Sequence, residues 1–279
     1  MILASHGIIS SSGNGVPLLL DTYSGASVAY SLRKLNTSYT GFAIRVRRSN
    51  DDTSQDIGFV NGNLDTTSLL SFVGANNGFV SIWYDQSGNG IDMLQPTQSN
   101  QPQIVNSGLV ILENSLPTVS FSTSQTLNTT SQNLVFYDCA ISYVSRNISG
   151  AGAIGVFGYG TNAQGSRTRY LGSISNNLTF IFFGTDTQSS LAGMGDTNLS
   201  LYSLNFESNT ANFYKNNSTQ NIGIPTLFNT TTSSFSINDI FNRGERGNIR
   251  FSEAIFYTSG KSSNISSIRN NQNTFYSIY

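Results

Sequence analysis

Hydrophobic and polar residues alternate with a period of two in many short runs of the chain, above all from about residue 100 onward. Each run is rich in β-branched or aromatic residues and is closed by Gly, Asn or Ser, which predicts strands separated by turns. The intervals between runs are typical of antiparallel sheets packed on each other, not of alternating strand–helix units. We therefore predict an all-β sandwich whose clearest strands are 109–112, 118–122, 134–144, 153–157, 178–183, 199–206 and 249–257.

Helical patterns are few. Residues 27–35 carry apolar side chains at spacings of four and three, and residues 65–73 begin at a capping aspartate. Residues 262–279 carry an apolar stripe after several serines, which predicts a closing C-terminal helix. No long linker rich in Pro, Gly or Ser divides the chain, so we expect an N-terminal arm, residues 1–18, followed by one domain, residues 19–279.

Composition limits the chemistry that this chain can perform. Only 10% of the 279 residues are charged, against about 25% in an average domain, but 18 Phe and 13 Tyr provide for a core. The net charge of −1 excludes the basic surface of a nucleic-acid-binding protein. A single cysteine and a single histidine exclude a disulfide framework, multi-cysteine metal sites and Ser-His-Asp catalysis. We expect no cofactor and no metal, and an enzyme of this composition has to use carboxylates.

The N-terminus carries no clear targeting signal. No Lys or Arg precedes Arg33, so the positive segment of a signal peptide is missing. The apolar runs at residues 1–4 and 16–20 are too short to span a bilayer. We therefore expect no signal peptide and no membrane span.

Residues 20–102 contain the most distinctive stretches of the sequence. They include Ala29-Tyr30-Ser31 and the run Tyr84-Asp85-Gln86-Ser87-Gly88-Asn89-Gly90. These stretches resemble the catalytic domain of the α-L-arabinofuranosidase B family, glycoside hydrolase family 54. The resemblance implies a concanavalin A-like jelly-roll sandwich. Single-domain chains with the same run and a similar closing helix are familiar as virion proteins of bacteriophages.

The family resemblance also implies where catalytic residues would lie. The family hydrolyses its substrate with two carboxylates about 5 Å apart, a nucleophile and an acid/base. The nucleophilic Glu precedes a Tyr-Leu-Gly stretch, and Arg167 stands at that place in this sequence. The acid/base Asp falls on Asn242. The resemblance therefore predicts a cleft that binds a ligand through Arg167, Arg169 and Asn242 without catalysis, with sequence drift in an unused groove as the alternative.

Trp83 and Asp85, at the start of the distinctive run, are further candidates for ligand binding. The stretch Trp83-Tyr84-Asp85 could form a sugar platform, because exposed aromatic rings stack on sugar faces and a carboxylate accepts bonds from hydroxyls. The alternative is a buried strand over residues 79–84 followed by a turn in which Asp85 and Asn89 bond backbone groups. We favour the buried strand, because residues 79–83 alternate as such strands do.

Basic residues concentrate between positions 33 and 48. They indicate either an anionic partner or local pairing with Asp51, Asp52 and Asp56, and we favour local pairing. Asp51, Asp52 and Asp85 could also bind Ca²⁺, but their spacing is not that of a known Ca²⁺ loop.

Three functions remain open from the sequence. The first is a non-enzymatic virion surface protein, made in the host cytoplasm, that contacts other virion subunits through its N-terminal arm, forms a homo-oligomer and attaches to a host-surface glycan. The second is an arabinofuranosidase-type hydrolase that uses Glu207, Glu253 or Asp186. The third is a free carbohydrate-binding module.

Overall fold

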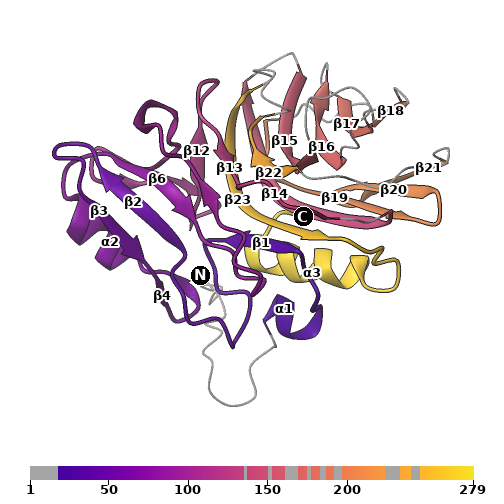
Figure 1. Ribbon diagram of the computed structural model, residues 1–279, viewed down its shortest axis with the longest axis horizontal. Helices are drawn as coiled ribbons and strands as arrows, with labels where there is room; N and C mark the ends of the chain where they lie inside the picture. Colours follow the sequence, from indigo (N-terminus) through magenta and orange to yellow (C-terminus); the bar gives the residue numbers. More distant parts are fainter. Residues whose placement is uncertain are drawn as a thin grey trace, which may run out of the picture.

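The computed structural model shows two layers of antiparallel strands packed face to face, with a helix on the outer side of one layer (Figure 1). Every strand pairing with a defined register is antiparallel, as the alternating pattern predicts for a sandwich. The structure describes residues 18–134, 137–149, 153–160, 169–174, 177–182, 187–191, 197–223, 233–239 and 246–279.

The first layer is built around the last strand of the chain, β23. On one edge β23 pairs with β14, and β19, β20 and β21 follow in order; on the other edge it pairs with β1 and β12. The strands of this layer are β1 (Val28–Ser31), β12 (Val119–Phe121), β14 (Cys139–Ser149), β19 (Ser200–Glu207), β20 (Thr210–Lys215), β21 (Ser218–Gly223) and β23 (Asn248–Tyr257).

The second layer runs from β18 through β17, β16, β15, β22 and β13 to β7. These strands are β7 (Met93–Leu94), β13 (Leu127–Asn128), β15 (Ala153–Gly160), β16 (Arg169–Ile174), β17 (Asn177–Phe182), β18 (Thr187–Leu191) and β22 (Ser234–Ile237).

A third group of strands connects the two layers at one end of the molecule, because β6 pairs with β7 of the second layer and with β8, which pairs with β12 of the first. Strands β2 and β3 extend this group from β6, and β9 extends it from β8. The bounds are β2 (Ile44–Arg48), β3 (Ser54–Ile57), β6 (Gly78–Trp83), β8 (Gln103–Asn106) and β9 (Leu109–Val110), with two small hairpins, β4 (Phe59–Val60) with β5 (Asn63–Leu64) and β10 (Leu112–Glu113) with β11 (Leu116–Pro117).

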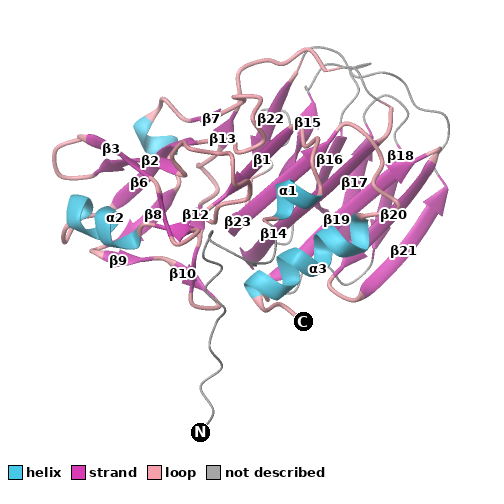
Figure 2. Ribbon diagram, turned by 90° about the horizontal axis from the view of Figure 1, so that it is seen from below, coloured by secondary structure: helices cyan, strands magenta, loops and turns pink. Residues whose placement is uncertain are grey.

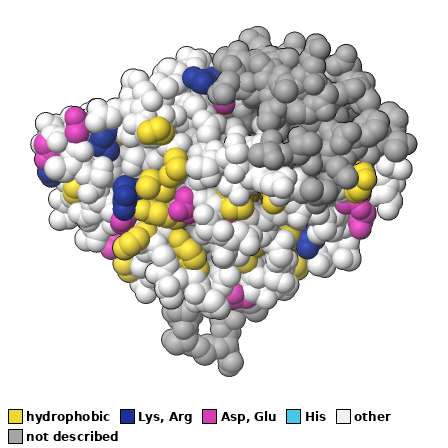
Figure 3. All heavy atoms as spheres, viewed as in Figure 1, with side chains coloured by type: hydrophobic (Ala, Val, Ile, Leu, Met, Phe, Trp, Pro, Cys, Tyr) yellow, Lys and Arg dark blue, Asp and Glu magenta, His cyan; other side chains and the backbone are white. Residues whose placement is uncertain are grey.

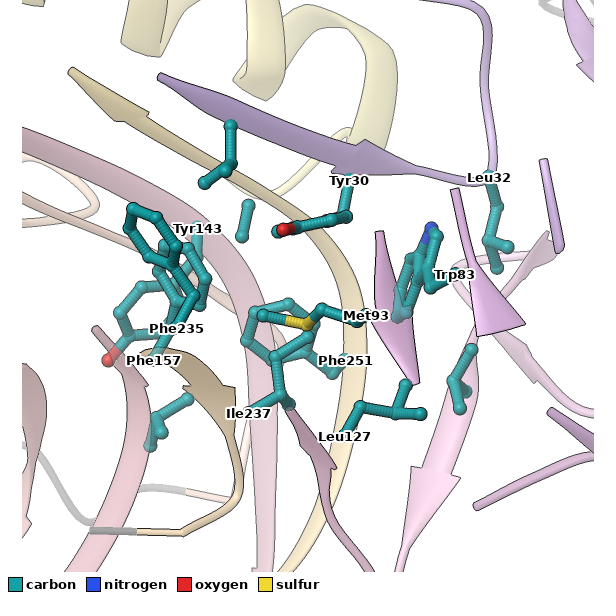
Figure 4. Close-up of a cluster of buried hydrophobic side chains, with 14 of the residues drawn as sticks. Tyr30, Leu32, Trp83, Met93, Leu127, Tyr143, Phe157, Phe235, Ile237 and Phe251 are labelled. Atoms are coloured by element: carbon teal, nitrogen blue, oxygen red, sulfur yellow. The ribbon is translucent and has the colours of Figure 1, made fainter. Parts of the chain in front are cut away.

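Aromatic side chains from both layers meet in the core (Figure 4). Tyr143 of β14 stacks on Phe251 of β23 with ring centroids 5.7 Å apart, and Phe157 of β15 reaches Phe251 from the other layer at 6.2 Å. Phe235 of β22 stacks on Phe157. Each such side chain contributes about 1.5–3 kcal/mol when fully buried, so this contact between layers is a main source of stability.

The three α-helices of the described residues test the sequence-based expectations. Helix α2 (Thr66–Val73) confirms the prediction for 65–73, since the Asp65 side chain accepts a hydrogen bond from the Ser68 amide. Helix α3 (Ile265–Tyr276) confirms the closing helix and lies with α1 (Leu19–Thr22) across the outer face of β14, β19 and β23 (Figure 2). A short 3₁₀ turn spans Gln98–Asn100.

The helix expected over 27–35 is wrong. Residues Val28–Ser31 form strand β1, paired with β23, and all four are buried. Because both faces of β1 are covered, it has no polar positions that would reveal alternation, and the apolar spacing imitates a helix.

The predicted fold class is confirmed: the chain is an all-β, concanavalin A-like jelly-roll sandwich with few helices and a C-terminal helix. Within the described residues no helix has the length and apolar character that a membrane crossing requires. The arm predicted for residues 1–18 lies, except for Leu18, outside the described residues.

Candidate functional site

The cleft residues predicted from the family resemblance fall mostly outside the described residues. This applies to Arg167 and Asn242, and also to Asp186. Arg169 is the first residue of β16 and its backbone pairs with Tyr159 of β15. The predicted ligand cleft at these positions stays a prediction.

Trp83 lies inside the core, not on the surface. Its side chain is 0% exposed and meets Phe251 edge-on at 6.1 Å, as Figure 4 shows. A ring without an exposed face cannot stack on a sugar, so the sugar-platform interpretation is wrong for Trp83 and the buried-strand interpretation holds.

Asp85 is the hub of the turn that follows β6. Its Oδ1 accepts hydrogen bonds from the amides of Ala29 at 2.8 Å and Ser87 at 2.9 Å. Its Oδ2 accepts from the Ile91 amide at 3.1 Å and from the Ser87 hydroxyl at 2.6 Å. Burial raises the pKa of Asp85, while these hydrogen bonds act in the opposite direction. Its oxygens are occupied by the protein itself, which indicates a structural role.

The next residues of the same run extend this structural role. The Gln86 side chain accepts a hydrogen bond from the Leu35 amide and donates to the carbonyls of Ser31 and Arg33. Asn89 donates to two carbonyls of the segment that leads into β1. The run that carries the family resemblance therefore fastens β1 and its flanking residues to β6.

Tyr84 directly follows β6. Its side chain points away from that of Trp83 and is partly exposed. Its ring lies 6.3 Å from that of Phe42, which is 48% exposed. Its hydroxyl donates to Asp56 Oδ1 at 2.7 Å. Figure 3 shows hydrophobic side chains gathered, with acidic and basic ones beside them, on the face that carries β2 and β6. We call Tyr39, Phe42, Arg45, Asp56 and Tyr84 the Phe42–Tyr84 cluster.

The charged half of the Phe42–Tyr84 cluster is a fork between neighbouring strands. Arg45 of β2 donates from Nε and Nη2 to the two carboxylate oxygens of Asp56 of β3, at 2.8 and 2.7 Å. The Arg45 hydrogen bond, followed by that from Tyr84, holds the pKa of Asp56 below its usual value although burial opposes this. The Arg45 side chain is 42% exposed, so part of it is accessible to solvent.

Gly41 allows the aromatic half of the cluster to form. A Cβ atom at this position would lie 2.5 Å from the Tyr39 hydroxyl, so only glycine lets the Tyr39 ring fold back over the chain. There the Tyr39 hydroxyl donates to the Phe42 carbonyl at 2.8 Å, and its ring meets Phe59 edge-on at 6.4 Å. The backbone of Phe42 is thereby tied to Tyr39 at the surface.

Three of the five basic residues between positions 33 and 48 pair locally, as favoured from the sequence, whereas Arg33 pairs with the distant Glu253. Besides Arg45–Asp56, the structure contains Arg47–Asp52 and Arg48–Asp51 ion pairs. Asp51 and Asp52 thus serve arginines, and among the described residues no group of three or more His, Cys, Asp or Glu side chains could hold a metal ion.

Of the carboxylates proposed for hydrolysis, Glu207 and Glu253 are described by the structure, and these two do not form a pair. Glu253 lies opposite Val144 on β14, while Phe206 lies opposite Cys139, which places Glu207 level with Asp138. Six residues of a strand separate the two levels, about 20 Å at 3.4 Å per residue. Glycosidase carboxylates lie about 5–9.5 Å apart. Glu253 is also fully buried in an ion pair with Arg33.

The sequence did not predict the Phe42–Tyr84 cluster as a group, although Tyr84 belonged to the stretch considered as a sugar platform and Arg45 and Asp56 to the predicted local pairing. A signal existed for Tyr84, since a strand that points Trp83 inward must point the next residue outward. No local pattern reveals that β2, β3 and β6 are neighbours, which is what brings Arg45, Asp56 and Tyr84 together.

Neither a protein-family model nor a curated protein sequence matches the chain. Solved structures do. A GH54 α-L-arabinofuranosidase soaked with a cyclic sulfate inhibitor superposes with a TM-score of 0.72 at 14% identity, covering 94% of this chain and 65% of the enzyme. An arabinofuranosidase complexed with arabinofuranosyl-α-1,2-xylobiose gives 0.69 at 15% identity, with 94% and 64% covered.

A more distant match is the binding domain of Paraclostridial Mosquitocidal Protein 1, with a TM-score of 0.53 at 15% identity over 69% of this chain and 49% of that one. The chain thus spans about two thirds of the length of the arabinofuranosidases that it matches. At these identities the likeness concerns the fold. The chain has a β-sandwich fold similar to that of the GH54 α-L-arabinofuranosidases.

Proposed function

We propose that this protein is a non-enzymatic glycan-binding protein displayed on the surface of a bacteriophage virion. The observation that carries the binding role is the Phe42–Tyr84 cluster: the half-exposed Phe42 ring lies next to the Tyr84 ring, whose hydroxyl bonds the Asp56 carboxylate that Arg45 also holds. A sugar ring can stack its C–H face on Phe42 and Tyr84 while its hydroxyls bond to Arg45 and Asp56. Proteins of similar fold supply supporting context, because some of them were solved with arabinofuranoside ligands.

A binding role requires no catalytic pair, and this agrees with the distance between Glu207 and Glu253. The alternative is a hydrolase of the arabinofuranosidase type. It is favoured only by the fold likeness, while Arg167 and Asn242 stand where the resemblance places the two catalytic acids. We therefore expect no release of nitrophenol from 4-nitrophenyl α-L-arabinofuranoside.

The binding role is tested on a glycan array with the full chain, followed by titration of the best-binding oligosaccharide. Phe42→Ala and Tyr84→Ala should each weaken binding at least tenfold with unchanged melting temperature. Leu109→Ala is the matched control, since Leu109 is 73% exposed and lies outside the cluster. Equal affinity in all three variants, or nitrophenol release by the unmodified protein, would overturn the proposal.

The virion context is a separate part of the proposal. It rests on the phage proteins that the sequence resembles and on the apolar residues of the arm, which we expect to add a strand-like contact to another virion subunit. Deleting residues 2–12 should leave the sandwich folded, remove the homo-oligomer and prevent incorporation into particles. Normal incorporation of the truncated chain would refute the role of the arm.

A further inference from the structure

Two arginines face each other across neighbouring strands of the first layer. Arg146 of β14 lies directly opposite Arg250 of β23. Side chains at directly opposite positions point to the same face with Cβ atoms about 4.5–5.5 Å apart, where like charges repel. Ile249 and Phe251, the neighbours of Arg250 on β23, point into the core, so both arginines lie on the outer face.

A single described carboxylate contacts this arginine pair. Arg146 Nη1 lies 3.2 Å from both carboxylate oxygens of Glu113, and Arg250 Nε lies 3.7 Å from Oε1. These contacts are longer than the roughly 2.7–2.9 Å of a strong arginine–carboxylate bond. One glutamate shared between two arginines leaves one positive charge uncompensated in this group.

The guanidinium of Arg250 has spare hydrogen-bonding capacity. Within the described part of the chain it donates no hydrogen bond, although it carries five N–H donors and its side chain is only 26% exposed. Burial, together with the charge of Arg146, lowers the pKa of Arg250, while Glu113 acts in the opposite direction. An arginine with unused N–H donors is stabilised by an anion that provides two acceptor oxygens.

Polar side chains continue the arginine pair across the sheet. Ser120 of β12 lies opposite Arg250 on its other side, and Gln103 of β8 lies opposite Ser120. Gln103, Ser120, Arg250 and Arg146 are all partly exposed. The Ser120 hydroxyl makes no hydrogen bond within the described residues, so a free hydroxyl stands next to the unsatisfied guanidinium. The row thus offers two guanidinium groups to a carboxylate, and the Ser120 hydroxyl and the Gln103 amide to hydroxyls next to that carboxylate.

We propose that Arg146, Arg250 and Ser120 form a binding site for the carboxylate of an acidic sugar. In the complex the carboxylate accepts from both guanidinium groups, and Ser120 bonds to a neighbouring sugar hydroxyl. Glu113 competes with the ligand for the same donors. The site shares no residue with the Phe42–Tyr84 cluster and does not depend on the function proposed for that cluster.

The experiment is a titration of the full chain with D-glucuronate, followed by calorimetry or by NMR shifts of the arginine side chains. D-glucose and inorganic sulfate serve as comparison ligands. We expect glucuronate to bind and glucose not to bind, with sulfate at least tenfold weaker than glucuronate. Arg250→Met should weaken glucuronate binding at least tenfold, whereas Lys34→Met, which also removes one positive charge, should leave it unchanged.

Glu113→Gln gives the sharpest test, because it removes the competing carboxylate and should tighten glucuronate binding severalfold. A purely structural role of the Arg146–Glu113–Arg250 group predicts lower stability and no gain in affinity. If Arg250→Met does not fold, Arg250→Lys replaces it, since lysine keeps the charge but loses the fork and should still weaken binding. A folded Glu113→Gln variant without tighter binding, equal affinities for sulfate and glucuronate, or equal effects at Lys34 and Arg250 would each overturn the proposal.

Discussion

Arg33 Nε lies 2.7 Å from Glu253 Oε2, and this buried ion pair links the residues that follow the first strand of the sandwich to the last strand. Arg33 Nη2 also donates to Glu253 Oε1 at 2.9 Å, so the contact is a two-pronged fork. Ser31, Gln272 and Tyr276 donate further hydrogen bonds to the same carboxylate. Because every partner comes from β1, its flank or α3, the network fixes the closing helix on the sheet.

Removing the cation of this pair should destabilise the protein strongly. In Arg33→Met the Glu253 carboxylate stays buried without its counter-ion, and such losses typically cost about 3–5 kcal/mol. Urea unfolding measures the difference. The neighbouring variant Lys34→Met removes the same charge without touching the network and should leave the midpoint nearly unchanged; a similar loss in both variants would contradict the role assigned to the pair.

The same network predicts the effect of acid. Burial alone would raise the pKa of Glu253, but the Arg33 ion pair and the hydrogen bonds from Ser31 and Gln272 outweigh it and hold the pKa below its usual value. A depressed pKa means that the folded state binds the proton less well than the unfolded state. The stabilisation is therefore complete above the unfolded glutamate pKa of about 4.3 and is lost as the pH falls below it.

Glu253→Gln has no proton to bind at this position. Its unfolding free energy should fall less steeply than that of the unmodified protein as the pH is lowered below about 4.3. Urea midpoints collected from pH 7 to pH 3 compare the two slopes. Parallel curves would show that Glu253 does not contribute to acid sensitivity.

Local patterns predicted the elements that carry their own signals. Helix α2 has a capping aspartate at Asp65 and a buried face of Leu69 and Val73, and it forms as expected. Strand β1 was predicted as a helix because its identity depends on pairing with β23, more than two hundred residues away. Pairing across that distance leaves no trace in the local spacing of apolar residues.

The candidate site also contains residues that local sequence patterns revealed and residues that they did not. The run from Tyr84 to Gly90 was identified as specific, but its side chains after Tyr84 serve the fold, since Asp85 and Gln86 bond the backbone around β1. The distinctive sequence of this run is therefore explained by the hydrogen bonds that connect β6 to the segment around β1, and not by catalysis. The Arg146–Arg250 pair could not be seen from the sequence, because their opposition follows from a register that shifts between Val144 and Ser145, where Ser252 of β23 has no partner on β14.

The opposite orientations of Trp83 and Tyr84 lead to opposite expectations for neighbouring substitutions. Trp83→Ala empties a fully buried site and should cost about 3–5 kcal/mol of stability. Tyr84→Ala should change stability much less and act mainly on glycan binding. Among the described residues the Trp83 Nε1 atom has no hydrogen-bond partner, so Trp83→Phe should cost less than Trp83→Ala. Thermal and urea unfolding of the three variants check this order, and a larger stability loss for Tyr84→Ala than for Trp83→Ala would contradict it.

Asp85→Asn tests whether the specific run is structural. The carboxylate satisfies three backbone amides, with Ala29 and Ser87 bonded to Oδ1 and Ile91 to Oδ2. An asparagine has one acceptor oxygen, and its amide nitrogen cannot accept a hydrogen bond. That nitrogen would face either the Ile91 amide or the amides of Ala29 and Ser87, so at least one of these donors would lose its partner. Leaving such a donor unsatisfied costs about 1–3 kcal/mol.

The matched control is Asp92→Asn. Within the described residues Asp92 accepts one hydrogen bond, from the Asp85 amide at 2.9 Å, and an asparagine oxygen can keep that bond. Urea unfolding should therefore show a clearly larger loss for Asp85→Asn than for Asp92→Asn, although both change one carboxylate to an amide. Equal losses would show that Asp85 contributes through its charge and not through its three amide hydrogen bonds. The structural role assigned to these bonds would then be wrong.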